Sequence, residues 1–243
     1  MIFKNTIVSS FLTNVNTIYT IDKYLKDGIL LLKANIPKII FIDENIYDEL
    51  KIYENELTSI IPIQKSKWYF NEYKDSLVNF DLNSNNKTKD TLEYMFTICN
   101  KTECIKKGIE LNFFNTNSFI WIDFGIRYIF KNDSDESFIE KIEKLKDKDY
   151  EKIRIGSIWD LNNSYNYDIY KEVTWYFAGG VFGGKKEKLI DFADKTKNKC
   201  IQVMIEQKTL MWEVNIWYLV YLENPTLLDC YKCDHNESLI NNY

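Results

Sequence analysis

Short apolar runs alternate along the chain with stretches in which apolar residues recur every three or four positions. Residues 6–12 and 38–42 are rich in β-branched and aromatic side chains, as buried parallel strands are. Between them, residues 18–34 carry apolar side chains at helical spacing. A short acidic helix over 44–53 and a strand over 58–63 extend the series. This β-α-β-α-β order predicts an α/β fold with a Rossmann-like, mostly parallel central sheet flanked by helices.

The same alternation continues with weaker signals. Residues 65–86 show no clear period and are interpreted as loop and broken helix. Further predicted elements are one helix over 88–110, a buried strand over 119–122, a charged amphipathic helix over 133–148, a strand over 152–158 and a buried helix over 210–222.

The composition narrows the class of protein. The 243 residues are 45% hydrophobic and 28% charged, with three prolines and eight glycines, so no flexible linker is evident. One compact domain over 1–243 is the simplest interpretation. The net charge is −5 and only Arg127 and Arg154 are arginines, which argues against a nucleic-acid-binding protein.

The expected location follows from the absence of targeting patterns and from the cysteines. No window reaches about 18 uninterrupted apolar residues, and residues 1–20 lack the charged and apolar regions of a signal peptide. Five cysteines are an odd set, which favours free thiols in a reducing compartment. We expect a cytoplasmic protein without a transmembrane segment, and peripheral association with a membrane stays open.

Asp123 follows the predicted strand 119–122 directly. The carboxyl ends of strands are where open α/β sheets bind ligands, and a carboxylate there suits a divalent cation on a diphosphate. Capping of the next helix is an equally good interpretation of this aspartate.

Four of the eight glycines lie in two pairs, Gly179-Gly180 and Gly183-Gly184. We interpret 175–184 as a strand-to-helix loop whose glycines let the backbone approach a small molecule. The spacing matches neither a Walker A loop nor G-x-G-x-x-G, so it does not by itself predict phosphate binding. A tight structural turn is the alternative.

Two polar residues stand out in the apolar segment 210–222. Glu213 and Asn215 are its only non-aromatic polar side chains, and a buried carboxylate is costly unless something pairs with it. Such carboxylates concentrate at functional sites, although structural ion pairs also occur.

The only histidine, His235, lies two residues after a C-x-x-C made by Cys230 and Cys233. These three side chains could ligate zinc, but no second cysteine pair has the spacing of a zinc ribbon. His235 as a ligand of a metal or a diphosphate is favoured, and a plain surface histidine is the alternative.

In their order along the chain, these segments resemble the HtrL/YibB family of proposed glycosyltransferases. The later half is also similar to the retaining GT-A enzymes related to the ABO transferases and glycogenin. In those enzymes a strand-end D-x-D holds a manganese-bound nucleotide diphosphate, and a glycine-rich segment faces the sugar. An acidic residue on a following helix lies near the anomeric carbon, and in the glycogenin group a late histidine completes the metal site.

The resemblance implies a role for each matching residue. Asp123 matches the first Asp of D-x-D, Gly179 and Gly180 the sugar-facing segment, Glu213 the acidic helix residue, and His235 the late histidine. Gly125 stands in place of the second Asp, so metal dependence is open. Lys101, Arg127 or Arg154 could then neutralise the diphosphate instead.

The resulting expectation is a GT-A-like, nucleotide-sugar-dependent glycosyltransferase. It would move a hexose from a nucleoside diphosphate sugar, with UDP-sugars foremost, to a glycan, lipid-linked or protein-linked acceptor, with retention by analogy. Glu213 would be catalytic, Asp123 and His235 would position Mn²⁺ (or Mg²⁺), and Ser9, Ser10 and Phe11 would border the nucleobase. Gly179, Gly180 and Asn215 would contact the substrate. The alternatives are a metal-dependent nucleotide-sugar hydrolase or nucleotidyltransferase, and an inactive binding or scaffold domain.

Overall fold

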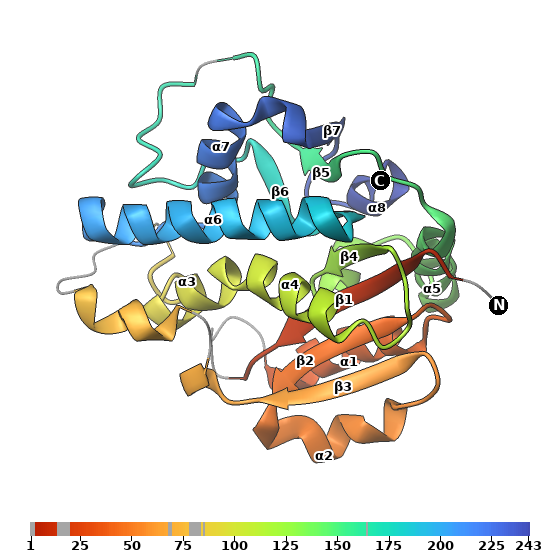
Figure 1. Ribbon diagram of the computed structural model, residues 1–243. Coiled ribbons are helices and arrows are strands. Elements are labelled where there is room, and N and C mark those ends of the chain that lie inside the picture. The colour runs from red at the N-terminus through yellow and green to blue at the C-terminus, as the bar shows by residue number, and fades with distance from the viewer. Residues whose placement is uncertain (1–2, 14–19, 68–69, 78–83, 85, 164) are drawn as a thin grey trace.

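The computed structural model describes residues 3–13, 20–67, 70–77, 84, 86–163 and 165–243. Within these residues, seven strands form one sheet in the order β3-β2-β1-β4-β6-β5-β7 (Figure 1). Of the seven, only β6 runs against the others. The strands are β1 (Asn5–Phe11), β2 (Lys38–Asp43), β3 (Thr58–Ile63), β4 (Ser118–Ile122), β5 (Ile153–Ser157), β6 (Phe177–Lys185) and β7 (Leu228–Lys232). The predicted mostly parallel α/β sheet is therefore confirmed.

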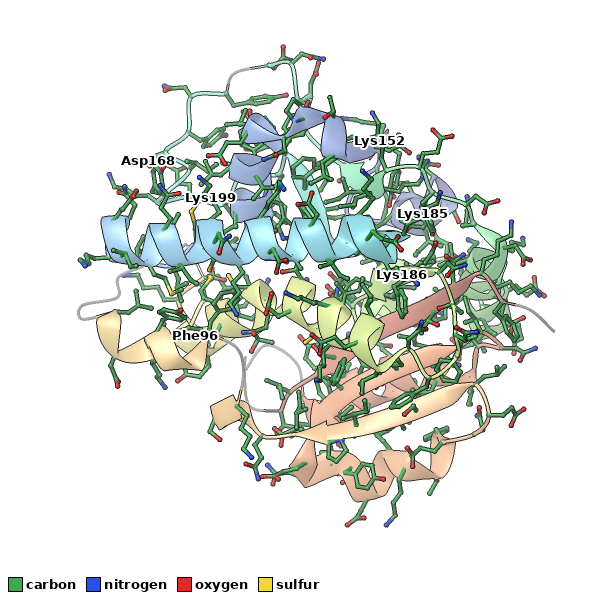
Figure 2. The ribbon with its side chains drawn as sticks, in the orientation of Figure 1. Phe96, Lys152, Asp168, Lys185, Lys186 and Lys199 are labelled. Carbon is green, nitrogen blue, oxygen red and sulfur yellow. The ribbon has the colours of Figure 1, made fainter. Side chains whose placement is uncertain are left out.

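Helices cover both faces of the sheet. One face packs against α3 (Leu92–Cys99), α4 (Lys101–Leu111), α6 (Lys186–Gln207) and α7 (Glu213–Glu223). The other packs against α1 (Ile21–Lys33), α2 (Tyr47–Leu50), α5 (Asp135–Glu143) and α8 (Ser238–Asn241). In Figure 1, α6 and α4 run alongside each other in front of the sheet. Figure 2 shows the side chains of this layer, with Phe96 marking α3 and Lys199 marking α6.

The strand order creates a switch point between β1 and β4. From β1 the chain moves outward through β2 and β3, and then returns to β4 on the other side of β1. Connections on either side of such a point diverge, which leaves a crevice at the carboxyl ends of the two strands. Gly108 brings α4 close to this region, because a Cβ there would lie 2.7 Å from the Val8 side chain of β1.

The predicted helix over 88–110 is wrong in one respect, because the structure has two helices that meet at Asn100. The backbone of Asn100 departs from the helix with ψ of −3°, and its side-chain amide donates to the Phe96 carbonyl at 2.6 Å. A side chain that bonds its own backbone competes with the helical hydrogen bonds. The break starts α4 at Lys101 and so fixes where that lysine lies.

The prediction of a loop over 175–184 is also wrong, because most of that stretch is the strand β6. No described glycine has a positive φ, so these glycines are not needed for an unusual backbone conformation. They are needed for space: a Cβ would lie 2.3 Å from the Glu213 carboxylate at Gly179, and 2.7 Å from the Phe119 carbonyl oxygen at Gly183. The elements α6, β7 and α8 have no counterpart in the sequence-based prediction.

Among the described helices, none is both long and apolar enough to cross a bilayer.

Candidate functional site

Two neighbouring cavities open at the carboxyl edge of the sheet. The larger has a volume of about 340 Å³ and lies at the switch point, with Ser10 and Phe11 from the end of β1 and Asp123 from the end of β4. Aromatic rings form much of its wall, including Tyr24, Phe124 and Tyr128. A flat, partly apolar ligand with a polar end would suit such a lining.

The smaller cavity has a volume of about 210 Å³ and lies beside β6. Gly179 and Gly180 of β6, Glu213 at the start of α7, Trp175 and His235 line it. Six residues line both cavities and so form their junction: Asn86, Lys89, Tyr94, Lys101, Asp123 and Tyr128.

Lys101 links the two cavities through its ammonium group. Its Nζ lies 2.9 Å from Asp123 Oδ1 and 2.9 Å from Glu213 Oε1, and donates to the Gly179 carbonyl at 3.0 Å. The lysine side chain is only 10% exposed. Burial by itself lowers the pKa of this ammonium, but the carboxylates of Asp123 and Glu213 outweigh it and raise the pKa above its usual value. The lysine therefore stays charged at neutral pH, and its three N–H groups all have acceptors.

Asp123 is held in place on one side and open on the other. The indole Nε1 of Trp121 donates to its Oδ1 at 2.7 Å, and its backbone N–H donates to the Gly180 carbonyl at 2.9 Å. The aspartate side chain is nevertheless 38% exposed and lines both cavities. A fixed carboxylate of this kind can accept a ligand hydrogen bond or contact a cation.

Glu213 is the first residue of α7, and its side chain is 8% exposed. It lies directly against the backbone of β6, where only a glycine at position 179 leaves room for the carboxylate. With Lys101 at 2.9 Å, the buried charge is compensated. The site thus presents a paired carboxylate to the smaller cavity.

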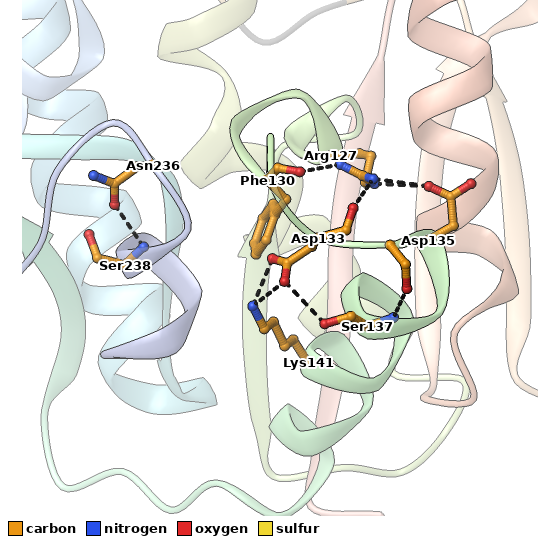
Figure 3. Close-up of polar contacts among 9 residues, drawn as sticks. Arg127, Phe130, Asp133, Asp135, Ser137, Lys141, Asn236 and Ser238 are labelled. Carbon is orange, nitrogen blue, oxygen red and sulfur yellow. Dashed lines mark hydrogen bonds and ion pairs between the residues drawn. The ribbon is translucent and has the colours of Figure 1, made fainter.

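A tight turn positions His235 at the edge of the smaller cavity. The backbone N–H of His235 donates to Asp234 Oδ1 at 2.7 Å. The backbone N–H of Ser238 donates to Asn236 Oδ1 at 2.9 Å, as Figure 3 shows. The imidazole meets the Trp175 ring edge-on, with centroids 4.3 Å apart. Partial removal from water lowers the pKa of His235, against the opposing effect of Asp234. A neutral imidazole can act as an acceptor or a metal ligand.

Two of the predicted site residues do not line either cavity. Ser9 is fully buried within β1, so of the three residues expected at the nucleobase only Ser10 and Phe11 face a cavity. Asn215 is also fully buried.

The side-chain amide of Asn215 forms its hydrogen bonds within the protein. Its oxygen accepts from the backbone N–H and hydroxyl of Thr174, and its nitrogen donates to the carbonyls of Ile169 and Glu172. The prediction of direct substrate contact is therefore corrected: Asn215 fixes the segment that leads to Trp175.

Of the three cations predicted as alternatives for the diphosphate, only Lys101 lines a cavity. Arg127 donates to the carbonyls of Phe130 and Asp133 and to the carboxylate of Asp135 (Figure 3). Arg154 pairs with Asp229 at 2.5 Å and donates to the carbonyl of Asn242. Both arginines fasten surface segments.

The sequence-based prediction missed Lys89, Tyr94 and Asn86, which all line both cavities. Tyr94 belongs to the apolar face of a helix, where a core role is the ordinary expectation. Lys89 and Asn86 lie in a polar stretch without periodicity, so no local signal distinguished them.

The donor set at the junction matches a metal ion only in part. In the parts of the chain that the structure describes, no three His, Cys, Asp or Glu side chains lie close enough to hold a metal together. Cys230, Cys233 and His235 accordingly do not form the zinc site considered as an alternative. Asp123 and His235 border the same cavity, so a metal there would need further oxygen ligands from a bound phosphate.

Comparisons with known proteins concern family and fold. A family model described as "Bacterial protein of unknown function (HtrL_YibB)" matches residues 5–239. No curated protein matches the sequence significantly. Among solved structures, the 4-diphosphocytidyl-2C-methyl-D-erythritolsynthase of Anaerococcus prevotii DSM 20548 is similar with a TM-score of 0.45 and 9% identity. The match covers 98% of this chain and 89% of that one. A likeness at this level carries no argument about activity.

Proposed function

The chain belongs to the HtrL_YibB family, and from this premise we propose that it is a glycosyltransferase that uses a nucleoside diphosphate sugar. One observation carries the proposal: a two-part cavity at the switch point of the sheet, joined by an ion-paired lysine between two carboxylates. Ligands of open α/β sheets bind at such switch points. The two parts match a donor that has a nucleoside at one end and a sugar at the other.

In this proposal the nucleoside occupies the larger cavity beside Ser10 and Phe11, and the hexose occupies the smaller one. Gly180 contributes no side chain to the wall of the smaller cavity, so a sugar ring can approach the backbone there, whereas Gly179 makes room for the Glu213 carboxylate. The diphosphate then lies at the junction, next to Asp123.

The chemistry is the exchange of one C–O bond for another. The bond between the anomeric carbon and the diphosphate oxygen breaks, the acceptor hydroxyl oxygen bonds to that carbon, and the hydroxyl proton passes to an oxygen of the departing diphosphate. Positive charge develops at the anomeric carbon in the transition state, and the Glu213 carboxylate would stabilise it or orient the acceptor. Retention of configuration is proposed only by analogy with the GT-A enzymes that the later half resembles.

Mn²⁺ or Mg²⁺ is proposed as the cofactor, held by Asp123 and His235 together with phosphate oxygens. Such an ion would offset the negative charge of the leaving group. The charge at the junction supports the need for a cation, because two lysines (Lys89, Lys101) face three carboxylates (Asp90, Asp123 and Glu213) across the two cavities.

The first test is thermal unfolding with UDP, GDP and ADP, each with and without Mn²⁺. A ligand that binds only the folded state at one hundred times its Kd adds about 2.7 kcal/mol to the free energy of unfolding. We expect UDP to raise the Tm, and Asp123→Ala to remove the part of the rise that depends on Mn²⁺. No response to any nucleotide would contradict a nucleotide-sugar enzyme and favour the scaffold alternative.

Product analysis separates transfer to carbon from attack at phosphorus. A glycosyltransferase releases UDP from a UDP-sugar. Attack at phosphorus instead releases the sugar 1-phosphate, together with UMP when water attacks (a hydrolase) or with UTP when pyrophosphate attacks (a nucleotidyltransferase). Release of UMP without UDP would contradict the glycosyltransferase proposal and favour a nucleotide-sugar hydrolase.

A further inference from the structure

The turn that precedes α3 brings a lysine to the junction of the two cavities. The backbone N–H of Lys89 donates to the Asn86 carbonyl at 3.0 Å, and that of Asp90 donates to the same oxygen at 2.9 Å. The Asn86 side-chain oxygen accepts from Lys89 N–H as well, at 3.3 Å. Lys89 and Asn86 both line both cavities, so this turn forms part of the wall between them.

The ring of Tyr94 packs against the ammonium of Lys89. The Lys89 ammonium lies 5.0 Å from the centroid of the Tyr94 ring, within the range of a cation–π contact. Tyr94 lies in the first turn of α3 and lines both cavities too. The ring holds the ammonium near the junction without neutralising its charge.

Lys89 differs from Lys101 in what surrounds its charge. Lys101 contacts two carboxylates and a carbonyl, which satisfy all three of its N–H groups. Among the residues that the structure describes, no carboxylate forms an ion pair with Lys89. The neighbouring carboxylate, Asp90, accepts a hydrogen bond from Ser84 instead. Lys89 is therefore the lysine at the junction with N–H groups to offer an anionic ligand.

We propose that Lys89 binds the diphosphate of the donor, with Asn86 beside it on the same turn. The inference rests on the proposed function and names the residue that recognises the phosphates at that site. An ammonium on a flexible four-carbon stem is a common ligand of phosphate oxygens, and a charge-assisted hydrogen bond is stronger than a neutral one. Lys101 acts differently: it orients Asp123 and Glu213 and does not have to leave them when the donor binds.

The test is calorimetric titration of wild type and Lys89→Met with UDP, UMP and uridine, with and without Mn²⁺. Loss of one charge-assisted contact predicts UDP binding weaker by about 10- to 100-fold. Uridine binding should stay unchanged, because uridine has no phosphate. Lys89→Arg should keep most of the affinity for UDP.

Lys87→Met is the matched control, because Lys87 is an exposed lysine two residues away that lines neither cavity. It should bind UDP as wild type does. Unchanged unfolding of unliganded Lys89→Met would show that the fold is intact, and Lys89→Gln provides a second variant of similar length.

The outcomes separate this inference from the proposed function. If wild type and Lys89→Met bind UDP equally well, the assignment of Lys89 is wrong while the nucleotide site stands. If Lys89→Met weakens uridine as much as UDP, the lysine shapes the cavity and does not recognise phosphate. If wild type binds no nucleotide at all, both the proposed nucleotide site and the role of Lys89 are wrong.

Discussion

The two edges of the sheet each bury a lysine, in opposite electrostatic surroundings. At the amino edge, Lys38 begins β2 and is 1% exposed, and its ammonium donates to the Ala34 carbonyl and the Thr58 hydroxyl. At the carboxyl edge, Lys101 lies between Asp123 and Glu213. Burial lowers the pKa of Lys38 to about 8, with Glu143 opposing the effect, whereas the two carboxylates raise that of Lys101.

This difference shows that a buried charge alone does not identify a functional site. The Lys38 ammonium has two neutral acceptors, and among the described residues no carboxylate forms an ion pair with it. Neither cavity of the candidate site reaches it. Lys101 is charged, paired and open to two cavities. The carboxyl edge therefore combines compensation of charge with access for a ligand, and the amino edge has only the burial.

The largest expected effect is that of Lys101→Met. It leaves the carboxylates of Asp123 and Glu213 close together without their cation, and breaking a buried pair in this way costs about 3–5 kcal/mol. Urea unfolding at pH 7.5 measures the fall in the free energy of unfolding. Lys38→Met is the control and should lose much less, since it removes an ammonium whose burial is unfavourable. If both variants lose the same free energy of unfolding, the two lysines do not differ in how their charges are compensated.

The next effect is a pH dependence that belongs to Lys38. Between about pH 8 and 10.5 this lysine is neutral in the folded chain but charged in the unfolded one, so unfolding takes up a proton and stability rises with pH. The fall in pKa from 10.5 to about 8 corresponds to about 3 kcal/mol across this window. The free energy of unfolding in urea is measured for wild type and Lys38→Met at pH 7.5 and at pH 10. The change in their difference between the two pH values isolates the contribution of Lys38 from those of other titrating groups. A difference that does not change with pH would show that Lys38 keeps its charge when buried.

A third comparison concerns two buried glutamates that each face a lysine. Glu213 pairs with Lys101 at the cavity, and Glu103 pairs with Lys197 at 3.5 Å between α4 and α6. Glu213→Gln should lower kcat on the order of 100-fold, the size of effect seen when one transition-state contact is removed. Glu103→Gln should leave kcat within about twofold. If the two variants keep equal kcat, Glu213 has no part in the reaction.

The smallest effects distinguish two glycines of β6. Gly179 lies at the carboxyl edge, where an added Cβ would come 2.3 Å from Glu213 Oε1, and Gly184 lies near the amino edge, where it would come 3.3 Å from the Lys152 carbonyl. Both Gly→Ala variants should lose stability by about 1–2 kcal/mol. Only Gly179→Ala should also reduce activity, by about tenfold or more, because it displaces the carboxylate. Parallel Tm and activity measurements decide this, and equal activity in both variants would contradict it.

The positions of the early strands were predictable because their signal is local. Apolar, β-branched runs indicate strands that contribute to the core, and β1, β2 and β3 lie close to the predicted ranges. Asp123 was identifiable for the same reason, since a carboxylate directly after a buried strand must lie at an edge of the sheet. The family was also recognisable from the order of these segments.

Strand direction and side-chain role in the second half were not local properties. The glycine pairs indicated a loop because glycine permits unusual backbone angles, but here it makes room within β6 for a neighbouring carboxylate. Asn215 was predicted to contact substrate because it is polar in an apolar helix, but its partners turned out to be backbone groups of the preceding segment.

The sequence by itself thus determined the buried strands of the first half and their order, the position of Asp123 directly after a buried strand, and the presence of Glu213 as a carboxylate in an apolar segment. Only the tertiary structure decided that Lys101 joins Asp123 and Glu213, that β6 runs antiparallel to its neighbours, and that Lys89 reaches the same junction. The physical reason is that hydrophobic periodicity records how each segment meets the core. Pairing between charges on distant segments depends on how the sheet and its helices are assembled.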